Sequence, residues 1–320
     1  MPLPTLPLSR VPVWAWRALM AHLAPGELRR FSADPIDGIE YRFDVDYAGD
    51  GMREHRLDVL TPVGATAPLP VYVYFHGGGW TSGDKAPLTR YCASQARASQ
   101  GRTGMLVVNV NYRRAPKFQM EHMLQDANRA LAWVREHARE LGGDEQRIVL
   151  GGDSAGGQIS ALLAAAMSRP ELAAHYSITP AVPASSIRGV VQHCSVSDFS
   201  VVFEKGFVLG LGFVRMLLPG RGRGQHLKHA ARFLSPIEWI DRSYPPVLVT
   251  TSRRDYLYRA NLNFIAVLRE HGVGVETLVH DDALHTWQQD SRHPASAEVY
   301  SRLQQFVGRV TGRNLVSGGA

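Results

Sequence analysis

The chain has 320 residues, of which 45% are hydrophobic and 20% charged, a balance typical of soluble globular proteins. This length forms one large domain or two small ones, and it can bury a sizeable core without disulfide bonds. The formal net charge is +6, but no basic stripe interleaved with aromatic residues occurs, so no nucleic-acid-binding surface is expected.

Membrane and secretion signals are also absent from the sequence pattern. No run of 18 apolar residues occurs, so neither a transmembrane helix nor membrane insertion is expected. The apolar N-terminus is interrupted by Pro2, Pro4, Pro7 and Pro12, which argues against a signal peptide. Two cysteines, Cys92 and Cys194, lie in apolar stretches and predict buried thiols in a reducing compartment. We therefore expect a cytoplasmic protein.

In chain order, the first expected elements are one or two short amphipathic helices at 13–31. A β-hairpin follows, because 39–48 and 53–60 alternate polar and apolar residues around Gly49-Asp50-Gly51. Beyond it, apolar runs alternate with helix-like segments. The expected strands are 68–75, 105–112, 147–152, 189–196, 247–252 and 275–280. The expected helices are 88–99, 121–141, 155–168, 259–271 and 294–310. This order indicates an α/β fold with a mostly parallel sheet.

Residues 199–240 break the alternation. They separate two expected strands by over forty residues and contain an apolar stretch at 207–218 and a glycine-rich basic turn at 220–224. Because connections in compact domains are usually much shorter, we expect a lid or cap here.

A serine flanked by two glycines follows the strand-like run 147–150 and precedes a helix-like run rich in Ala and Leu. The pentapeptide 152–156 (GDSAG) is a weak signal alone and gains weight from this context. In so tight a strand-to-helix turn, side chains at Gly152 and Gly156 would collide with neighbouring backbone. The serine oxygen would point out of the sheet edge, near free N–H groups of the helix. We predict Ser154 as a nucleophile.

Consecutive glycines follow the strand that ends at Phe75, in the sequence HGGGW at 76–80. Without side chains, backbone N–H groups can face a concave site and stabilise the negative oxygen that forms during acyl transfer. We predict an oxyanion hole made by the N–H groups of Gly77 and Gly78, with a third donor from Ala155, directly after the serine.

A serine nucleophile needs a base, and the base needs a carboxylate that orients it. Asp255 follows the expected strand 247–252, and His285 follows 275–280. Both therefore lie at the edge where α/β sheets place their ligands. The other histidines near the motifs fit worse, because they lie in the glycine loop, on a helix or in the insertion. Three further carboxylates remain open as the acid: Asp198, Asp281 and Asp282.

Together these motifs resemble the hormone-sensitive-lipase-like branch of the α/β-hydrolases, the bacterial class IV carboxylesterases, over about residues 70 to 310. The matching residues are HGGGW at 76–80, Tyr112-Arg113, Ala115-Pro116, Asp126, Trp133, GGDSAGG at 151–157, Pro245-Pro246, Asp255 and His285. The stretch HGGGWTSGDK at 76–85 is also similar to the family that includes kynurenine formamidases. The resemblance implies the α/β-hydrolase fold, with about eight strands, helices on both faces and a small helical cap.

The resemblance also implies where the cap lies. Members build it from N-terminal helices and from an insertion after the sixth strand. We therefore expect an N-terminal cap segment at 1–38, a cap insertion at 199–240, and a catalytic domain split into 39–198 and 241–320.

Two departures from the family pattern concern the pocket. Arg253 and Arg254 stand where many relatives carry a glycine before the acid, and His285-Thr286-Trp287 replaces a common His-Gly-Phe. Neither departure removes a catalytic group, and both can narrow the pocket. A carboxylate beside the nucleophile, at a helix N-terminus, also favours a structural role for Asp153. The expected substrate-binding residues are Trp80, Asp153 and Trp287.

These residues predict a serine hydrolase that cleaves short- to medium-chain acyl or aryl esters through a Ser-His-Asp triad and an acyl-enzyme. The expected partner is a small-molecule ester substrate, and a homodimer is left open. No cofactor and no metal are expected, since spacing such as H-E-x-x-H is absent.

Two other functions remain open. One is an arylformamidase or another amide, lactone or thioester hydrolase. The other is a non-catalytic small-ligand receptor on the same fold, as in plant gibberellin receptors, which lack the catalytic histidine. A basic cluster would either meet an acidic substrate or form solvated cap surface. Its members are Arg221, Arg223, Lys228 and Arg232.

Overall fold

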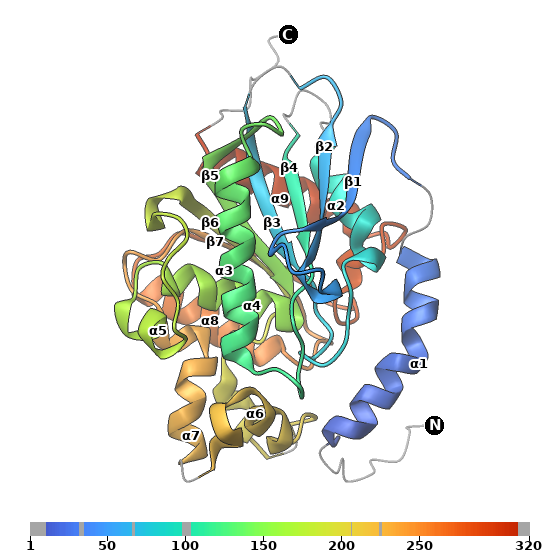
Figure 1. Cartoon of the computed structure of the whole chain (residues 1–320). Helices are drawn as coiled ribbons and strands as arrows, with labels where there is room; N and C mark the ends of the chain where they lie inside the picture. The colour runs from blue at the N-terminus through green and yellow to red at the C-terminus, as the bar shows by residue number, and fades with distance from the viewer. Residues whose placement is uncertain are drawn as a thin grey trace.

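The structure, a computed structural model, describes residues 11–31, 35–65, 68–97, 104–205, 207–223 and 226–312. These residues build a central eight-stranded sheet with helices on both faces (Figure 1). The strand order across the sheet is β1-β2-β4-β3-β5-β6-β7-β8. Among the residues in these ranges, none of the helices combines the length and apolar character that a bilayer span requires.

The sheet opens with an antiparallel hairpin and continues with parallel strands. β1 pairs antiparallel with β2, and β2 antiparallel with β4. All the other pairs are parallel, which confirms the expected hairpin and parallel sheet. The strands are β1 Ile39–Asp46, β2 Arg56–Pro62, β3 Leu69–Phe75, β4 Leu106–Val110, β5 Gly143–Asp153, β6 Ile187–His193, β7 Val247–Ser252 and β8 Val275–His280.

Two helical layers cover the sheet. Helices α3, α4 and α8 pack on one face, and α2 and α9 pack on the opposite face (Figure 1). The helices are α1 Val13–Phe31, α2 Thr89–Ala96, α3 Met120–His137, α4 Ser154–Ala166, α5 Pro170–His175, α6 Leu211–Leu217, α7 Leu227–Ala230, α8 Tyr258–Glu270 and α9 Ser296–Val310. α1 is one continuous helix that includes Pro25, and α5 is a short helix that the apolar pattern did not predict.

The centre of the molecule explains the runs of apolar residues in the sequence. Every residue of β3 and β4 is buried, because helices cover both faces of these strands. All the residues of α4 are buried as well. A helix that is buried on every side needs small and apolar residues around its whole circumference, and α4 is rich in Ala, Gly and Leu. The helix that begins at Ser154 is therefore fixed inside the core.

A buried ionic network anchors the hairpin to α3. His55 is buried, with its Nδ1 2.8 Å from Asp50 Oδ2 and its Nε2 3.1 Å from Asp126 Oδ1. Arg113 binds Asp126 through Nε and Nη2, at 2.8 and 2.7 Å. Because a carboxylate faces each ring nitrogen of His55, the doubly protonated ring is favoured. Hydrogen bonding to Asp126 raises the pKa of His55 above its ordinary value, although burial opposes the shift.

This network makes the stability of the protein depend on pH. A histidine whose pKa is raised in the folded state contributes stability below its unfolded pKa of about 6.5, and this stability is lost as the pH rises through the folded pKa. We expect the unfolding free energy, measured by urea denaturation, to fall over that range in the wild type. The His55→Gln variant should lack this part of the fall. Replacement of the exposed His229 by Gln should leave it intact, and parallel curves for wild type and His55→Gln would contradict the assignment.

Candidate active site

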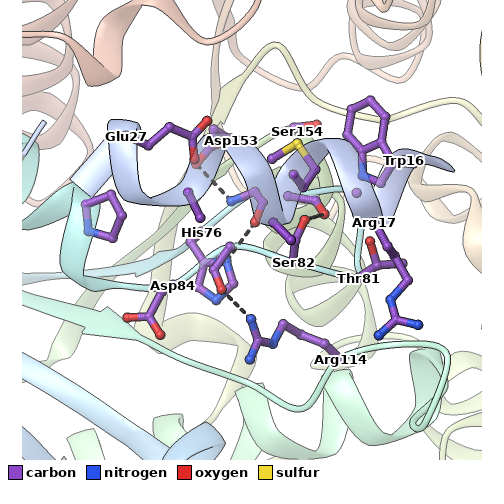
Figure 2. A pocket seen from close by; sticks show the side chains of 18 of the residues that line it. Trp16, Arg17, Glu27, His76, Thr81, Ser82, Asp84, Arg114, Asp153 and Ser154 are labelled. Atoms are coloured by element: carbon purple, nitrogen blue, oxygen red, sulfur yellow. Dashed lines mark hydrogen bonds between the residues drawn. The ribbon is translucent and has the colours of Figure 1, made fainter. Parts of the chain in front are cut away.

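A cavity of about 880 Å³ opens at the carboxyl edge of the parallel strands (Figure 2). Trp16 and Met20 of α1 form one wall of it. The opposite side contains the glycine loop 76–79 together with Ser154 and His285. Three sequence motifs that are far apart along the chain therefore meet around one space.

Ser154 lies at the turn between β5 and α4, and its φ of +50° is in the left-handed region that residues with side chains rarely adopt. A Cβ atom on Gly156 would lie 2.0 Å from the carbonyl oxygen of Phe75. One on Gly152 would lie 2.4 Å from the backbone of Gly156. These clashes confirm that only glycine fits on either side of the serine, as the sequence predicted.

Asp255 and His285 lie next to each other, in the loops after β7 and β8. His285 Nδ1 is 2.9 Å from Asp255 Oδ1, which also accepts a hydrogen bond from the Leu257 N–H at 2.8 Å. The side chain of Asp255 is fully buried, whereas that of His285 is 25% exposed. A buried carboxylate on Nδ1 leaves Nε2 on the cavity side, where a base must act.

The three reserve carboxylates are not in contact with His285 within the part of the chain that the structure describes. Asp198 accepts a hydrogen bond from Asn263 Nδ2 at 2.7 Å. Asp281 pairs with Arg253 at 2.8 Å on the exposed surface, and Asp282 is exposed. Of these four carboxylates, Asp255 is therefore the one that contacts His285, the candidate base.

The glycine loop has the open backbone that the sequence predicted, but one assigned donor is already used. The Gly77 N–H donates to Asp153 Oδ1 at 3.1 Å, so the prediction that it serves the oxyanion hole is wrong. The Gly77 carbonyl lies 2.7 Å from His76 Nδ1, and the Gly78 carbonyl accepts from Ser82 Oγ at 2.6 Å (Figure 2). In a trans peptide the next N–H points the opposite way. The N–H groups of Gly78 and Gly79 therefore point away from these loop contacts.

Backbone conformation shows why both positions are glycine. Gly78 has a φ of +117°, and Gly79 has a φ of +59°. A Cβ on Gly78 would lie 2.3 Å from the Ser82 carbonyl oxygen, and one on Gly79 would lie 2.6 Å from Trp16 Nε1. Gly79 was not among the donors predicted from the sequence, although its place as the third glycine of the motif makes it a further candidate.

Asp153 is a buried link between the serine turn and the glycine loop. Its Oδ1 accepts the Tyr74 hydroxyl at 2.7 Å as well as the Gly77 N–H. Burial raises the pKa of this carboxyl, while the hydrogen bonds act in the opposite direction. These contacts support the structural role that the sequence favoured, although Asp153 also borders the cavity.

The two tryptophans expected to bind substrate do not line the cavity. Trp80 is 1% exposed, donates from Nε1 to Gln158 Oε1 at 2.5 Å, and packs on Phe199 and Phe213. Trp287 is buried and packs edge to face on His280. Both side chains form core rather than binding surface, because both are buried and neither borders the cavity. Motif position alone did not reveal this orientation.

The departures from the family pattern have little effect on the cavity. Arg253 and Arg254 are exposed and do not line it, so the expectation that they narrow the pocket is wrong. Thr286 does line it, with a φ of +56°.

Of the basic cluster in the insertion, none of the four side chains borders the cavity. Arg232 instead stacks on Phe233 and Trp239, and Arg221, Arg223 and Lys228 are exposed.

Cys194 also lies close to Asp255 and His285. Its Sγ, a carboxylate oxygen of Asp255 and a ring nitrogen of His285 all lie within 4.8 Å of one another. Burial raises the pKa of the Cys194 thiol well above its ordinary value, which keeps it protonated. Since a thiolate is the form that binds metals, this group is a poor metal site. Cys92 and Cys194 are both free and buried, as predicted.

Comparisons with known proteins show the family to which the chain belongs. A family described as having the alpha/beta hydrolase fold matches residues 72–289, more than half of the chain. The chain is 38% identical over 161 residues to carboxylesterase NlhH of Mycobacterium tuberculosis, across 49% of this chain and 48% of that protein. It is 28% identical over 303 residues to esterase LipQ of the same organism, across 91% and 66%. The chain thus spans about half the length of NlhH.

Solved structures show the same fold. Esterase B from Lactobacillus Rhamnosis has a TM-score of 0.80 at 20% identity, and the match covers 94% of this chain and 95% of that one. A bacterial heroin esterase has a TM-score of 0.74 at 22% identity, covering 95% and 94%. The chain belongs to the α/β-hydrolase fold family, which confirms the resemblance drawn from its motifs.

The buried link through Asp153 can be tested by its effect on stability. Asp153→Ala leaves the Tyr74 hydroxyl and the Gly77 N–H buried without an acceptor, at a cost of about 1–3 kcal/mol each. Asp153→Asn keeps an acceptor oxygen, so it should lose less unfolding free energy in urea. The exposed Asp282→Ala is the control. An Asp153→Ala protein as stable as the wild type would show that the link contributes nothing.

Proposed function

We propose that this α/β hydrolase is a serine esterase that cleaves short- to medium-chain acyl or aryl esters through an acyl-enzyme. The observation that carries the proposal is the His285–Asp255 pair, at 2.9 Å, on the same cavity as the strained Ser154. The names of NlhH and LipQ, which are a carboxylesterase and an esterase, support the same reaction class.

In the proposed mechanism, Ser154 Oγ attacks the ester carbonyl while His285 Nε2 takes its proton. Asp255 holds the ring through Nδ1 and stabilises the positive charge that the ring acquires. The C–O bond of the ester breaks, and His285 returns the proton to the departing alcohol. A water activated by His285 then hydrolyses the acyl-enzyme, which restores Ser154.

The negative oxygen of the tetrahedral intermediate needs fixed donors. We infer that the N–H groups of Gly78, Gly79 and Ala155 supply them. Ala155 is in the first turn of α4, where N–H groups have no partner within the helix. The loss of one such donor typically costs about 3–4 kcal/mol of transition-state stabilisation. Gly79 thus takes the role first expected of Gly77.

We also infer that residues 1–38 and 199–240 together form the cap, of which residues 1–10, 32–34, 206 and 224–225 lie outside the described ranges. The Val11 N–H donates to the Val208 carbonyl at 2.9 Å, and Trp16 meets Phe213 edge to face at 6.2 Å. In this arrangement α1 lines the cavity, whereas no described residue of 199–240 does. The insertion supports α1, and α1 limits the space for substrate.

The proposal is tested by assaying p-nitrophenyl esters of graded acyl length, with N-formylkynurenine alongside. We expect Ser154→Ala to lower kcat on the order of 10⁶-fold, as loss of a triad nucleophile does. Ser168→Ala, just beyond the other end of α4, makes the same chemical change away from the cavity and should keep full activity.

The outcomes separate the candidate functions. A wild-type protein inert on every ester would refute the esterase proposal. Full activity in Ser154→Ala would refute the assignment of the nucleophile. A sharp preference for N-formylkynurenine would instead favour the formamidase alternative.

The role of α1 can be tested through Met20, which lines the cavity. Met20→Ala removes buried volume, and one methylene in a hydrophobic pocket is worth about 1–3 kcal/mol. We expect the ratio of kcat/KM for octanoyl over acetyl esters to rise by about tenfold or more. Leu19→Ala alters an exposed side chain of the same helix and is the control. An unchanged ratio would show that α1 does not bound the acyl group.

A further inference from the structure

Tyr256 is a polar side chain at the site for which the triad gives no role. It directly follows Asp255 in the chain and lines the cavity. Its hydroxyl oxygen is 3.3 Å from His285 Nε2, and the two rings lie 4.6 Å apart between centroids. Nε2 is the nitrogen that must exchange the proton, so this hydroxyl already lies beside the reacting atoms.

The surroundings of the hydroxyl keep it a hydrogen-bond donor. Desolvation raises the pKa of Tyr256, and the negative charge of Asp255 raises it further, whereas a hydrogen bond with Ser154 acts in the opposite direction. The residue as a whole is 37% exposed, and its ring lies 6.5 Å from that of Phe207. The phenol thus stays protonated at neutral pH, with its hydroxyl beside His285 and Ser154.

The geometry of ester cleavage says which substrate atom this hydroxyl meets. The departing oxygen must come within hydrogen-bond distance of His285 Nε2 in order to receive the proton. A hydroxyl that is itself within 3.3 Å of Nε2 is then a neighbour of that oxygen. The carbonyl oxygen, in contrast, is directed to the glycine loop. We propose that the Tyr256 hydroxyl donates a hydrogen bond to the leaving-group oxygen of the ester, an inference that rests on the proposed esterase function.

The step leaves Tyr256 chemically unchanged. The bond between Ser154 Oγ and the acyl carbon has formed, and the bond between that carbon and the leaving oxygen breaks with its electron pair going to the oxygen. The proton on His285 Nε2 passes to this oxygen. The phenol keeps its own proton throughout and stabilises the charge that builds on the oxygen before the transfer is complete.

In this role, the rate increase that the Tyr256 hydroxyl provides depends on the leaving group of the ester. A nitrophenolate spreads its charge over the ring and departs with little help. An alkoxide concentrates its charge on one oxygen, so a donor to that oxygen matters more. A hydroxyl that merely held His285 in place would assist both esters equally, because the base serves both.

The experiment compares two acetate esters, p-nitrophenyl acetate and ethyl acetate, which share the acyl group and differ in the alcohol. kcat/KM reports acylation, the step in which the alcohol leaves. Tyr256→Phe removes only the hydroxyl. We expect about a tenfold loss with ethyl acetate and less than about a twofold loss with p-nitrophenyl acetate, in line with one lost hydrogen bond.

Tyr258→Phe is the matched control, since its hydroxyl contacts the exposed Arg253 and does not border the cavity. It should leave both rates unchanged. Equal losses of Tyr256→Phe on both esters, or no loss on either, would overturn the proposal while leaving the esterase function intact. A wild-type protein that cleaves neither ester would refute the esterase function and this inference with it.

Discussion

The carboxylate of Asp153 ties together the two loops on which the site depends. It sits one residue before Ser154 and accepts hydrogen bonds from the Tyr74 hydroxyl and the first N–H of the glycine loop. The loop therefore cannot move relative to the serine without breaking a buried bond. Gly156 reinforces the link, because its backbone lies so close to the Phe75 and His76 carbonyls that no Cβ would fit. The proposed nucleophile and the proposed oxyanion donors are thereby held as one rigid unit, which preorganised electrostatic stabilisation requires.

The parallel register brings the remaining groups to the same edge. Phe75 is level with Gly152 across β3 and β5, and Ser252 is level with His280 across β7 and β8. Within each of these two pairs the following loops begin at the same height, and all four loops leave the carboxyl edge of the sheet, so the glycine loop, Ser154, Asp255 and His285 converge although they span more than 200 residues of sequence. The sheet supplies the convergence, and the buried α4 fixes the direction of the serine turn.

Much of this arrangement follows from local patterns. Strands such as β7 and β8 match the expected bounds, because continuous β-rich runs between turns have few alternatives. The glycines around Ser154 and the pairing of Asp255 with His285 also follow from motif chemistry and chain order. The direction in which a side chain points does not follow from these local patterns. Trp80 sits beside the glycine loop in sequence, but its φ of +63° directs the ring into the core, towards Gln158.

The proposed oxyanion donors show the same limit. Which of three adjacent glycines presents a free N–H depends on the partners of the flanking carbonyls, and Ser82 and Asp153 decide this through tertiary contacts. The sequence also did not predict that α1 forms a wall of the cavity. An amphipathic pattern predicts that a helix packs on another surface, but it does not identify that surface. In each of these cases the determining contact joins segments that are distant in the chain.

The charged side chains that line the cavity affect which ligands it can bind. Four basic side chains and four acidic ones line it. Several of these side chains already interact with other groups of the protein. Arg114 donates to the Gly83 carbonyl at 2.5 Å, and Asp84 pairs with Arg53 at 3.0 Å. A wall whose charges balance and pair creates little net field to attract an ionic substrate. For the proposed esterase, selection then rests on shape and apolar contact along α1, which suits neutral esters better than anionic ones. The exposed basic residues of the insertion do not alter this balance, because they lie outside the cavity.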